Sequence, residues 1–212
     1  MSEAGPFRVV VLVSGSGTNL QSLIDGVHAA GGPIEIVLVV SSSEEAFGLE
    51  RARRAGIPTR VVPLEGGDRE ARDRVLADVV EAADPGLVVL AGWMSILTSV
   101  FLDRFTDRVI NLHPSLLPAF PGLHAIEQAL EWGVRYTGVT VHYAEEVVDG
   151  GPPILQEPVP VIYGDTPDSL RERVREAEHR LVPEAVRLFA ARRVRRDPVD
   201  RRRVEIVEGE QL

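Results

Sequence analysis

The feature that most constrains the fold is an alternation of short, continuous apolar segments with amphipathic ones along the first half of the chain. Residues 7–13 form an apolar run interrupted only by Arg8, and residues 34–40 and 87–91 form similar runs. Continuous apolar strands are typical of a parallel sheet covered by helices on both faces, whereas a half-exposed strand alternates. The sequence therefore predicts an α/β fold with a doubly wound, mostly parallel sheet and right-handed crossovers.

Helices are expected between these strands. The pattern predicts a helix with Leu20, Leu23, Ile24 and Val27 on its buried face, a helix over about residues 44–55, a short strand at residues 61–62, and a helix over residues 69–83 with Val75, Leu76, Val79 and Val80 inside.

The second half of the chain has a different pattern. Residues 137–143 alternate as a half-buried strand does, and residues 154–161 resemble an antiparallel neighbour. The intervening EEVVDGGPP predicts a tight turn that brings Asp149 to a strand end. A long helix is expected over residues 166–192, with Thr166 as N-cap and Pro167 at its first position. Its inward face would carry Leu170, Val174 and Leu181.

Composition and charge narrow the class of protein. No repeat or linker divides the 212 residues, so one domain over residues 1–212 is the economical prediction. A net charge of −9 argues against broad nucleic-acid binding. No apolar run approaches the roughly 20 residues that cross a bilayer, and the start MSEAGPFR does not resemble a signal peptide, so we expect a cytoplasmic protein without a membrane partner. The chain has neither cysteine nor lysine, which excludes disulfides, thiolate chemistry and Schiff bases.

Arginines cluster in ARRVRRDPVDRRR, residues 191–203, within a basic-then-acidic tail at about residues 193–212. An RNA-binding tail is one interpretation. A solvated helix end followed by a loose strand is favoured, because charge runs usually lie on solvated surface.

A glycine-rich turn is the first candidate site. VLVSGSGTNL, residues 11–20, places Gly15 and Gly17 between the first strand and the first helix. Free backbone N–H groups at the positive end of a helix dipole bind anions, and phosphate is the natural ligand. The spacing fits neither a dinucleotide fingerprint nor a Walker motif. A merely tight turn would explain the glycines nearly as well.

The second candidate site is VINLHPSLLPAFPGLH, residues 109–124, where an apolar strand ends in Asn111 and His113 and enters a proline-rich loop. Ligands of open parallel sheets bind beyond the carboxyl ends of the strands. With Asp149, these residues supply an amide donor, an imidazole and a carboxylate, the groups that acyl transfer through an oxyanion needs. The alternative is a structural histidine and a turn-capping asparagine.

Three further residues were open to a functional interpretation. His124 could face the same cleft or pack within its loop, and the sequence does not decide between these. His142 is interpreted as structural within its strand, and Trp132 as a packing residue.

Taken together, the segments SGSGTNLQSLID, AFGLERARRAGIP, VVLAGWM, VINLHPSLLPAFPGLH, VDGGPPILQ and REAEHRL resemble the phosphoribosylglycinamide formyltransferase family, from about residue 9 to residue 189. The signature N-x-H-P-S-L-L-P with a later D-G-G turn is a hallmark of folate formyltransferases. The resemblance implies the doubly wound sheet with an antiparallel C-terminal extension and a long C-terminal helix. It also implies formyl transfer from 10-formyltetrahydrofolate to the amine of phosphoribosylglycinamide, in purine biosynthesis.

The resemblance also implies roles for particular residues. Asn111, His113 and Asp149 would be the catalytic trio; Gly17, Thr18 and Asn19 would hold the substrate phosphate, with Glu178 at the ribose or glycinamide end; and Arg69, Met94, Ser95, Ile96, Leu97 and Asn111 would contact folate. No metal is expected, the partners would be small molecules, and a homodimer is left open. The family usually has arginine where this chain has Ser95, so contact with the folate glutamate tail is expected to be weaker or rerouted.

Three rival functions are disfavoured. Methionyl-tRNA formyltransferase adds a C-terminal domain, for which the roughly 20 residues after Arg192 leave no room. Formyltetrahydrofolate deformylase carries an N-terminal regulatory domain, whereas the first strand here begins at Phe7. A non-catalytic phosphate-binding module would leave Asn111, His113 and Asp149 unexplained.

Overall fold

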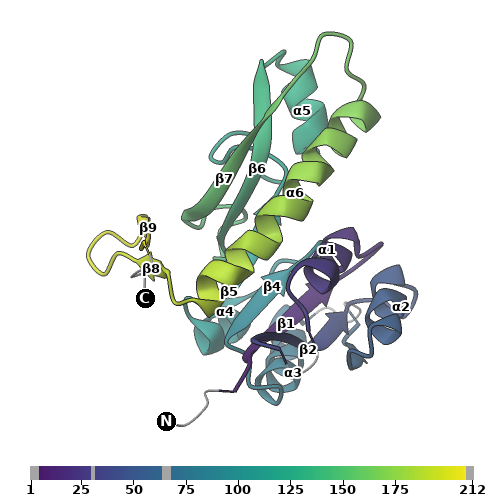
Figure 1. The fold of residues 1–212 in the computed structure, drawn as a ribbon, viewed down its shortest axis with the longest axis vertical. Helices are drawn as coiled ribbons and strands as arrows, with labels where there is room; N and C mark the ends of the chain where they lie inside the picture. Colours follow the sequence, from purple (N-terminus) through teal and green to yellow (C-terminus); the bar gives the residue numbers. More distant parts are fainter. Residues whose placement is uncertain (1–4, 30–31, 64–67, 209–212) are drawn as a thin grey trace. The chain divides into compact units, whose positions relative to one another are not determined.

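A seven-stranded sheet forms the centre of the structure, a computed structural model that describes residues 5–29, 32–63 and 68–208. Its strands follow the order β3 (Thr59–Val61), β2 (Ile34–Ser41), β1 (Phe7–Val13), β4 (Leu87–Leu90), β5 (Val109–His113), β6 (Tyr136–Tyr143) and β7 (Pro153–Pro160) (Figure 1). β1 pairs in parallel with β2 and β4, and β2 pairs in parallel with β3. β6 and β7 are antiparallel. The expected α/β fold, mostly parallel with an antiparallel extension, is confirmed.

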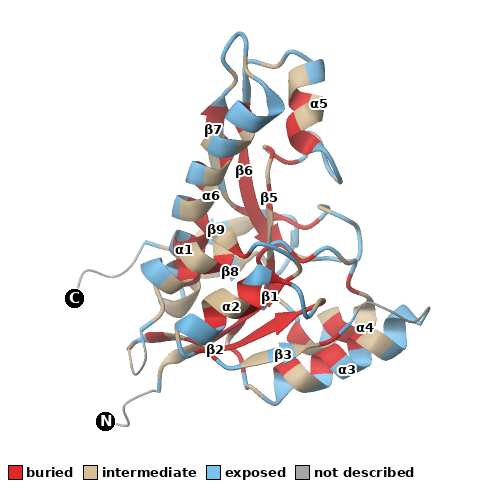
Figure 2. Cartoon of the chain, turned by 90° about the vertical axis from the view of Figure 1, so that its right-hand side faces the viewer, coloured by how far each residue is buried: buried red, intermediate tan, exposed pale blue. Residues whose placement is uncertain are grey.

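The chain divides into two compact units, residues 1–110 and 111–212. The first unit contains β1 to β4 with α1 (Thr18–Gly26), α2 (Phe47–Arg54), α3 (Arg69–Glu81), α4 (Ser99–Leu102) and a short 3-10 helix, Asp103–Phe105. Residues 9–13 of β1 are completely buried, and Figure 2 shows the strands as mostly buried ribbon. Burial on both faces is what the continuous apolar runs predict. The single domain expected over residues 1–212 stays a prediction.

The helices of the first unit differ from expectation in two places. α2 begins at Phe47 rather than near residue 44, because the preceding residues form a turn in which Ser43 Oγ accepts a hydrogen bond from Glu45 N. In α3, Val75 is 54% exposed and Asp73 is completely buried, so the prediction of an inward Val75 is wrong. The buried face of α3 is Asp73, Leu76, Ala77 and Val80, a spacing of three and four residues that excludes position 75.

The buried carboxylate of Asp73 ties α3 to the segment after β4. Arg72 Nε and Nη2 donate to Asp73 Oδ1 at 2.8 and 2.5 Å, and Thr98 N donates to Oδ2 at 2.6 Å. Arg72 also donates to Ser95 Oγ at 2.6 Å and to Ile96 O at 2.9 Å. Because a buried charge needs such partners, the network fixes residues 95–98 against α3.

The second unit consists of the β6–β7 hairpin with α5 (Ala125–Glu131), α6 (Pro167–Ala190), β8 (Val194–Arg196) and β9 (Val204–Ile206). Every residue of β6 after Tyr136 is buried, so the prediction of a half-buried strand is wrong. The reason is the loop that follows β5: Thr140 Oγ1 donates to Ser115 O at 2.7 Å and accepts from Leu117 N at 3.0 Å. This loop covers the face of β6 that alternation assigns to solvent.

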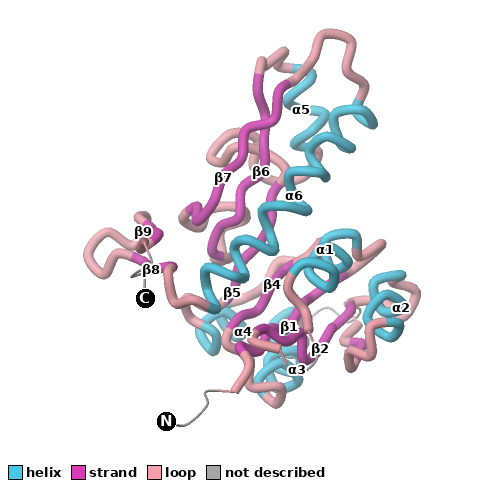
Figure 3. Tube along the Cα trace, in the orientation of Figure 1, coloured by secondary structure: helices cyan, strands magenta, loops and turns pink. Residues whose placement is uncertain are grey.

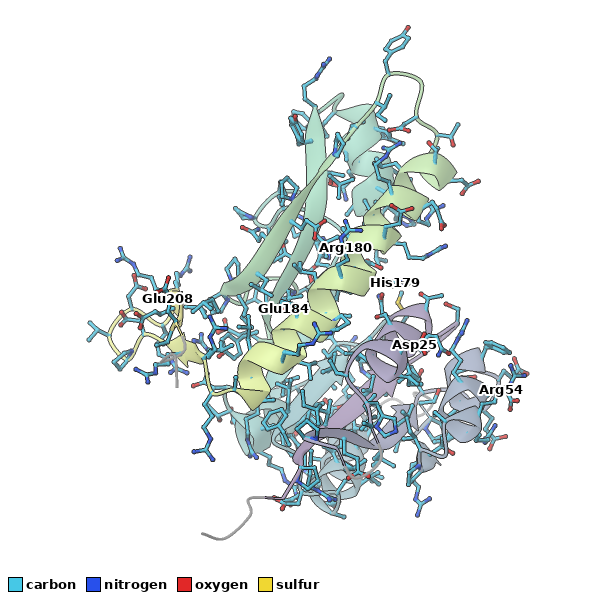
Figure 4. All side chains as sticks on the ribbon, viewed as in Figure 1. Asp25, Arg54, His179, Arg180, Glu184 and Glu208 are labelled. Carbon is cyan, nitrogen blue, oxygen red and sulfur yellow. The ribbon has the colours of Figure 1, made fainter. Side chains whose placement is uncertain are left out.

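The long helix α6 begins as the sequence predicts. Thr166 and Ser169 form a reciprocal capping box, and Pro167 is the first helical residue. Leu170, Val174 and Leu181 are buried as expected, and the helix contains Pro183 without ending there. α6 contacts both β6 and β7, beside which Figure 3 shows it as one long helix. Arg180 on α6, labelled in Figure 4, pairs with Glu157 on β7.

The arginine-rich segment after α6 is not the loose strand that was expected. β8 and β9 pair antiparallel, with Val194 opposite Ile206 and Arg196 opposite Val204. Val207 N donates to Arg193 O at 2.8 Å and Arg193 Nε donates to Val207 O at 2.7 Å, which closes the hairpin at its base. Residues 209–212 of the predicted tail lie outside the described residues.

Asp165, just before α6, provides a test of the contacts that hold the start of this helix. Hydrogen bonds from Arg173 and from the Ile162 N–H hold the pKa of Asp165 well below its usual range. Because the folded pKa lies below an unfolded value of about 3.9, the carboxylate stabilises the fold above that pH, and the contribution disappears as pH falls through the folded pKa. Asp165→Asn should therefore lower the free energy of unfolding at neutral pH, and the difference from wild type should shrink on acidification.

Urea unfolding at a series of pH values measures this difference. The control is Asp168→Asn, since Asp168 is 95% exposed and its pair with Arg171 should contribute little. A destabilisation by Asp165→Asn that does not change with pH would contradict the assignment.

Candidate active site

Asn111 and His113 lie at the carboxyl end of β5, which is anchored by its first two residues. Val109 and Ile110 are 3% and 1% exposed, and His113 is also buried. The loop after His113 is fixed by hydrogen bonds: Gln156 Nε2 donates to Leu117 O at 2.9 Å, and Thr140 engages the same loop. His113 therefore projects from a rigid strand into a rigid loop.

Both ring nitrogens of His113 face hydrogen-bond acceptors. Nε2 lies 2.8 Å from the carbonyl oxygen of Phe120, and Nδ1 lies 3.2 Å from Asp149 Oδ2. A carbonyl oxygen can only accept a hydrogen bond, so Nε2 carries a hydrogen. If Nδ1 carried none, its lone pair would face the negatively charged Asp149 carboxylate, which is unfavourable. The imidazolium form, with hydrogens on both nitrogens, satisfies both contacts.

Asp149 is held in a backbone conformation that is uncommon outside glycine. Its φ is 52°, and Phe120, the other partner of His113, has φ 51°. Asp149 Oδ2 accepts from Gly122 N at 2.8 Å, and the side chain is 7% exposed. Burial acts to raise the pKa of Asp149, but the hydrogen bonds from His142 and Gly122 and the charge of His113 lower it below the usual value. The carboxyl is therefore a carboxylate at neutral pH.

His142 is the residue that the sequence interpretation missed. It was expected to be structural, yet its Nε2 lies 3.3 Å from Asn111 Nδ2 and 3.6 Å from Asp149 Oδ1. Asn111 Nδ2 also donates to Asp149 Oδ1 at 3.4 Å. The available signal was its place at the carboxyl end of β6, the strand that neighbours β5 in the sheet. The structure thus brings together Asn111, His113, Asp149 and a second histidine.

The glycine turn of the first unit packs closely against α2. Gly17 has φ 68°, and a Cβ there would lie 2.6 Å from Gly48 Cα, so only glycine fits. The three carbonyl groups of residues 15–17 are occupied: Gly15 O accepts from Gly48 N, Ser16 O from Arg51 Nε at 2.9 Å, and Gly17 O from Gln21 N. Because a peptide's C=O and N–H point in opposite directions, the N–H groups of Ser16 and Gly17 are directed away from α2.

Arg51 is a further residue that sequence reasoning did not single out. Its guanidinium contacts Ser16 O and Gln21 Oε1 and lies 5.0 Å from the centre of the Phe47 ring. It therefore places a positive charge beside the glycine turn. Thr18 and Asn19, the first residues of α1, are half-buried at the same turn.

The segment expected to contact folate lies next to this turn within the first unit. Ser14 N donates to Gly92 O at 3.1 Å, and Met94 N donates to Ser14 Oγ at 2.9 Å. Met94 and Ile96 are 67% and 46% exposed, which is unusual for large apolar side chains, whereas Leu97 is buried. Ser95 is held by Arg72, so a guanidinium does lie at this segment, but it comes from α3.

The remaining candidates are placed as follows. Arg69 is exposed at the first position of α3, and Glu178 is half-buried on α6 in the second unit. His124 is exposed immediately before α5 with φ 64°. Trp132 is 77% exposed at the end of α5, so its interpretation as a packing residue is wrong.

Two searches of the described residues gave negative results. None of their helices combines the length and the apolar character that crossing a membrane requires. Among the same residues, no three histidine, aspartate or glutamate side chains form a group that could hold a metal ion.

Comparison with known proteins agrees with the geometry. The sequence model of the formyl transferase family matches residues 7–186. Phosphoribosylglycinamide formyltransferase of Escherichia coli (strain K12) is 44% identical over 189 residues, 89% of this chain and 89% of that protein. The crystal structure of glycinamide ribonucleotide transformylase 1 from Symbiobacterium toebii is 46% identical, with a TM-score of 0.90 over 96% of this chain and 95% of that one.

Longer relatives contain the same region. The trifunctional purine biosynthetic protein adenosine-3 of Bos taurus is 46% identical over 189 residues, which are 89% of this chain and 19% of that protein. This chain therefore spans about a fifth of such relatives. The resemblance seen in the sequence motifs is confirmed: the chain belongs to the formyl transferase family.

Proposed function

We propose that this chain transfers the formyl group of 10-formyltetrahydrofolate to the amine of phosphoribosylglycinamide. The observation that supports this most strongly is the buried carboxylate of Asp149, which gathers Asn111, His113 and His142 around one point. The names of the bacterial relatives, which align over most of their length, indicate the same reaction.

When bound, 10-formyltetrahydrofolate supplies the formyl carbon that the substrate amine attacks. The chain must then stabilise negative charge on the formyl oxygen. Asn111 Nδ2 has two N–H bonds, and one of them donates to Asp149 Oδ1 at 3.4 Å. Its orientation is thereby fixed, and the second N–H is the donor to the formyl oxygen.

His113 supplies positive charge and a proton. Its Nδ1–H stays with Asp149, because a buried carboxylate depends on its partner more than a loop carbonyl does. Its Nε2–H is bonded to Phe120 O, which is the acceptor that substrate would replace. We assign to His113 the transfer of this proton toward the departing folate nitrogen, and the proton that the attacking amine loses returns His113 to its imidazolium form. Asp149, with its lowered pKa, remains a carboxylate and pairs with Nδ1 of His113.

The first unit contains groups that suit other parts of the two substrates. The amides of residues 17–19 and the charge of Arg51 suit the phosphate, as does the start of α1. The exposed side chains of Met94 and Ile96 suit the flat, apolar ring of folate. Glu178 is assigned to the ribose or glycinamide end of the substrate, and Arg69 to the folate, from the family resemblance.

The trio is tested by kcat and its pH dependence in a formyl-transfer assay with phosphoribosylglycinamide. Asp149→Asn removes the negative charge but keeps the shape of the side chain, so kcat should fall by roughly a hundredfold or more. The alkaline limb of the pH profile, where kcat declines as pH rises, should move to lower pH. Asn111→Ala should lower kcat by roughly a hundredfold without moving that limb. Asp107→Asn is the control, because Asp107 shares the left-handed backbone of Asp149, with φ 56°.

An unchanged alkaline limb in Asp149→Asn, with chemistry rate-limiting, would mean that Asp149 does not keep His113 charged. Formate release into water at the rate of formyl transfer would instead indicate a deformylase.

The phosphate assignment is tested through Arg51. Arg51→Gln removes the charge beside the turn and releases Ser16 O, so KM for the ribonucleotide should rise several-fold while KM for folate stays constant. The effect should decrease at high salt, which screens charge. Arg54→Gln, on the same helix but paired with Glu50, is the matched control (Figure 4). Equal increases in both KM values would contradict a phosphate site here.

The folate assignment is tested at Ser95. If the glutamate tail passes this segment, Ser95→Arg should lower KM for polyglutamylated folate more than for the monoglutamate, and more at low salt. Ser95→Ala is the control, since it removes the hydrogen bond from Arg72 without adding charge. If KM for the polyglutamate does not fall at low ionic strength, the tail runs elsewhere.

A further inference from the structure

The arginines of the C-terminal hairpin are not equivalent. Neighbouring positions on β8 face opposite ways: Arg195 is exposed, whereas the side chain of Arg196 is only 12% exposed. β9 contacts β7, so the hairpin packs against the β6–β7 extension, beside which Figure 1 shows it. A run of charge that looks uniform in sequence thus contains one arginine that points into the second unit.

Arg196 contacts a backbone carbonyl, an aromatic ring and a carboxylate. Its Nε donates to Arg201 O at 2.7 Å, which fixes the guanidinium within the hairpin. The guanidinium lies 5.3 Å from the centre of the Tyr143 ring, and Nη2 forms an ion pair with Glu145. A planar cation that stacks on a ring and also bonds a carboxylate has little freedom to move.

The loop that carries Asp149 starts after Tyr143 and returns to pair with the backbone of Tyr143. Its N donates to Pro152 O at 3.1 Å, across the base of that loop. A Cβ at Gly151 would lie 1.9 Å from Tyr143 O, so the returning backbone packs directly against this carbonyl. The same carbonyl accepts from His142 Nδ1 at 2.8 Å. The position of Tyr143 therefore sets both the base of the Asp149 loop and the ring of His142.

We propose that Arg196 is a positioning residue for formyl transfer, which clamps Tyr143 and Glu145 so that Asp149 and His142 keep their contacts with His113 and Asn111. The C-terminal hairpin is then part of the apparatus that holds the site and not a dispensable tail. This inference rests on the proposed function, because it acts through Asp149.

The test compares kcat and both KM values in four purified full-length variants. Arg196→Gln removes the positive charge and the planar guanidinium, whereas Arg196→Lys keeps the charge alone. Glu145→Gln removes the negative charge of the carboxylate that pairs with Arg196. Arg195→Gln is the matched control on the exposed side of β8. Because a misplacement of about 1 Å can cost on the order of a hundredfold in rate, we expect Arg196→Gln to lower kcat by about tenfold or more. Both KM values of Arg196→Gln should stay within about twofold of wild type. The kcat values of Arg196→Lys and Glu145→Gln should lie between those of Arg196→Gln and wild type, and the kcat of Arg195→Gln should match wild type.

A double-mutant cycle separates positioning from general stability. If Arg196 acts through Asp149 and His142, Arg196→Gln should cause a clearly smaller fold-loss of kcat in an Asp149→Asn background than in the wild-type background. A purely structural role would give the same fold-loss in both backgrounds.

Each outcome decides between the two proposals. If Arg196→Gln matches Arg195→Gln, or if its effect is additive with Asp149→Asn, the clamp is overturned while the proposed function stands. If Asp149→Asn itself keeps the wild-type kcat, the proposed function fails. Should Arg196→Gln not fold, Arg196→Lys and Glu145→Gln carry the same comparison, and kcat equal to wild type in both would overturn the clamp.

Discussion

The buried, charged carboxylate of Asp149 is the group around which the second unit is organised. A carboxylate removed from water is costly unless hydrogen-bond donors replace the lost solvation. Its donors come from three separate segments: the end of β5, the backbone at Gly122 and the end of β6. Satisfying this one charge therefore fixes the mutual positions of Asn111, His113 and His142, and it does so with Asp149 in a left-handed conformation that only firmly held surroundings maintain.

The sequence is sufficient to predict the sheet, because the sheet depends on local patterns, whereas the catalytic roles of Asn111, His113 and Asp149 come from the family resemblance and stay a prediction. Continuous apolar strands identify a parallel sheet, and the polar residues at the end of β5 mark the sheet edge where ligands are expected. His142 also lies at a strand end, but its position in an alternating strand favoured a structural interpretation. Alternation along β6 assigns position 142 to the same face as Thr140, and that face is covered by the loop after β5, a contact between distant segments that no local pattern encodes.

Buried charges account for two further differences between expectation and structure. Asp73 interrupts an apolar helix face, yet it is buried because Arg72 and Thr98 N satisfy it, and a hydrophobic pattern counts only apolar side chains. The same limit applies to the arginine-rich hairpin. Charge runs usually lie on solvated surface, and Arg196 departs from that rule because Tyr143 and Glu145 receive its guanidinium. Arginine, with its planar fork, is suited to such partly buried positions.

The central claim is that Asp149 holds His113 as an imidazolium between two acceptors. Nitrogen-15 NMR of the histidine rings reports directly which nitrogens carry hydrogen. At neutral pH the account predicts that both nitrogens of His113 are protonated in the wild-type protein, and that Nδ1 loses its hydrogen in Asp149→Asn while Nε2 stays bonded to Phe120 O. A His113 ring with one bare nitrogen in the wild-type protein, or one that is unaffected by Asp149→Asn, would contradict the account.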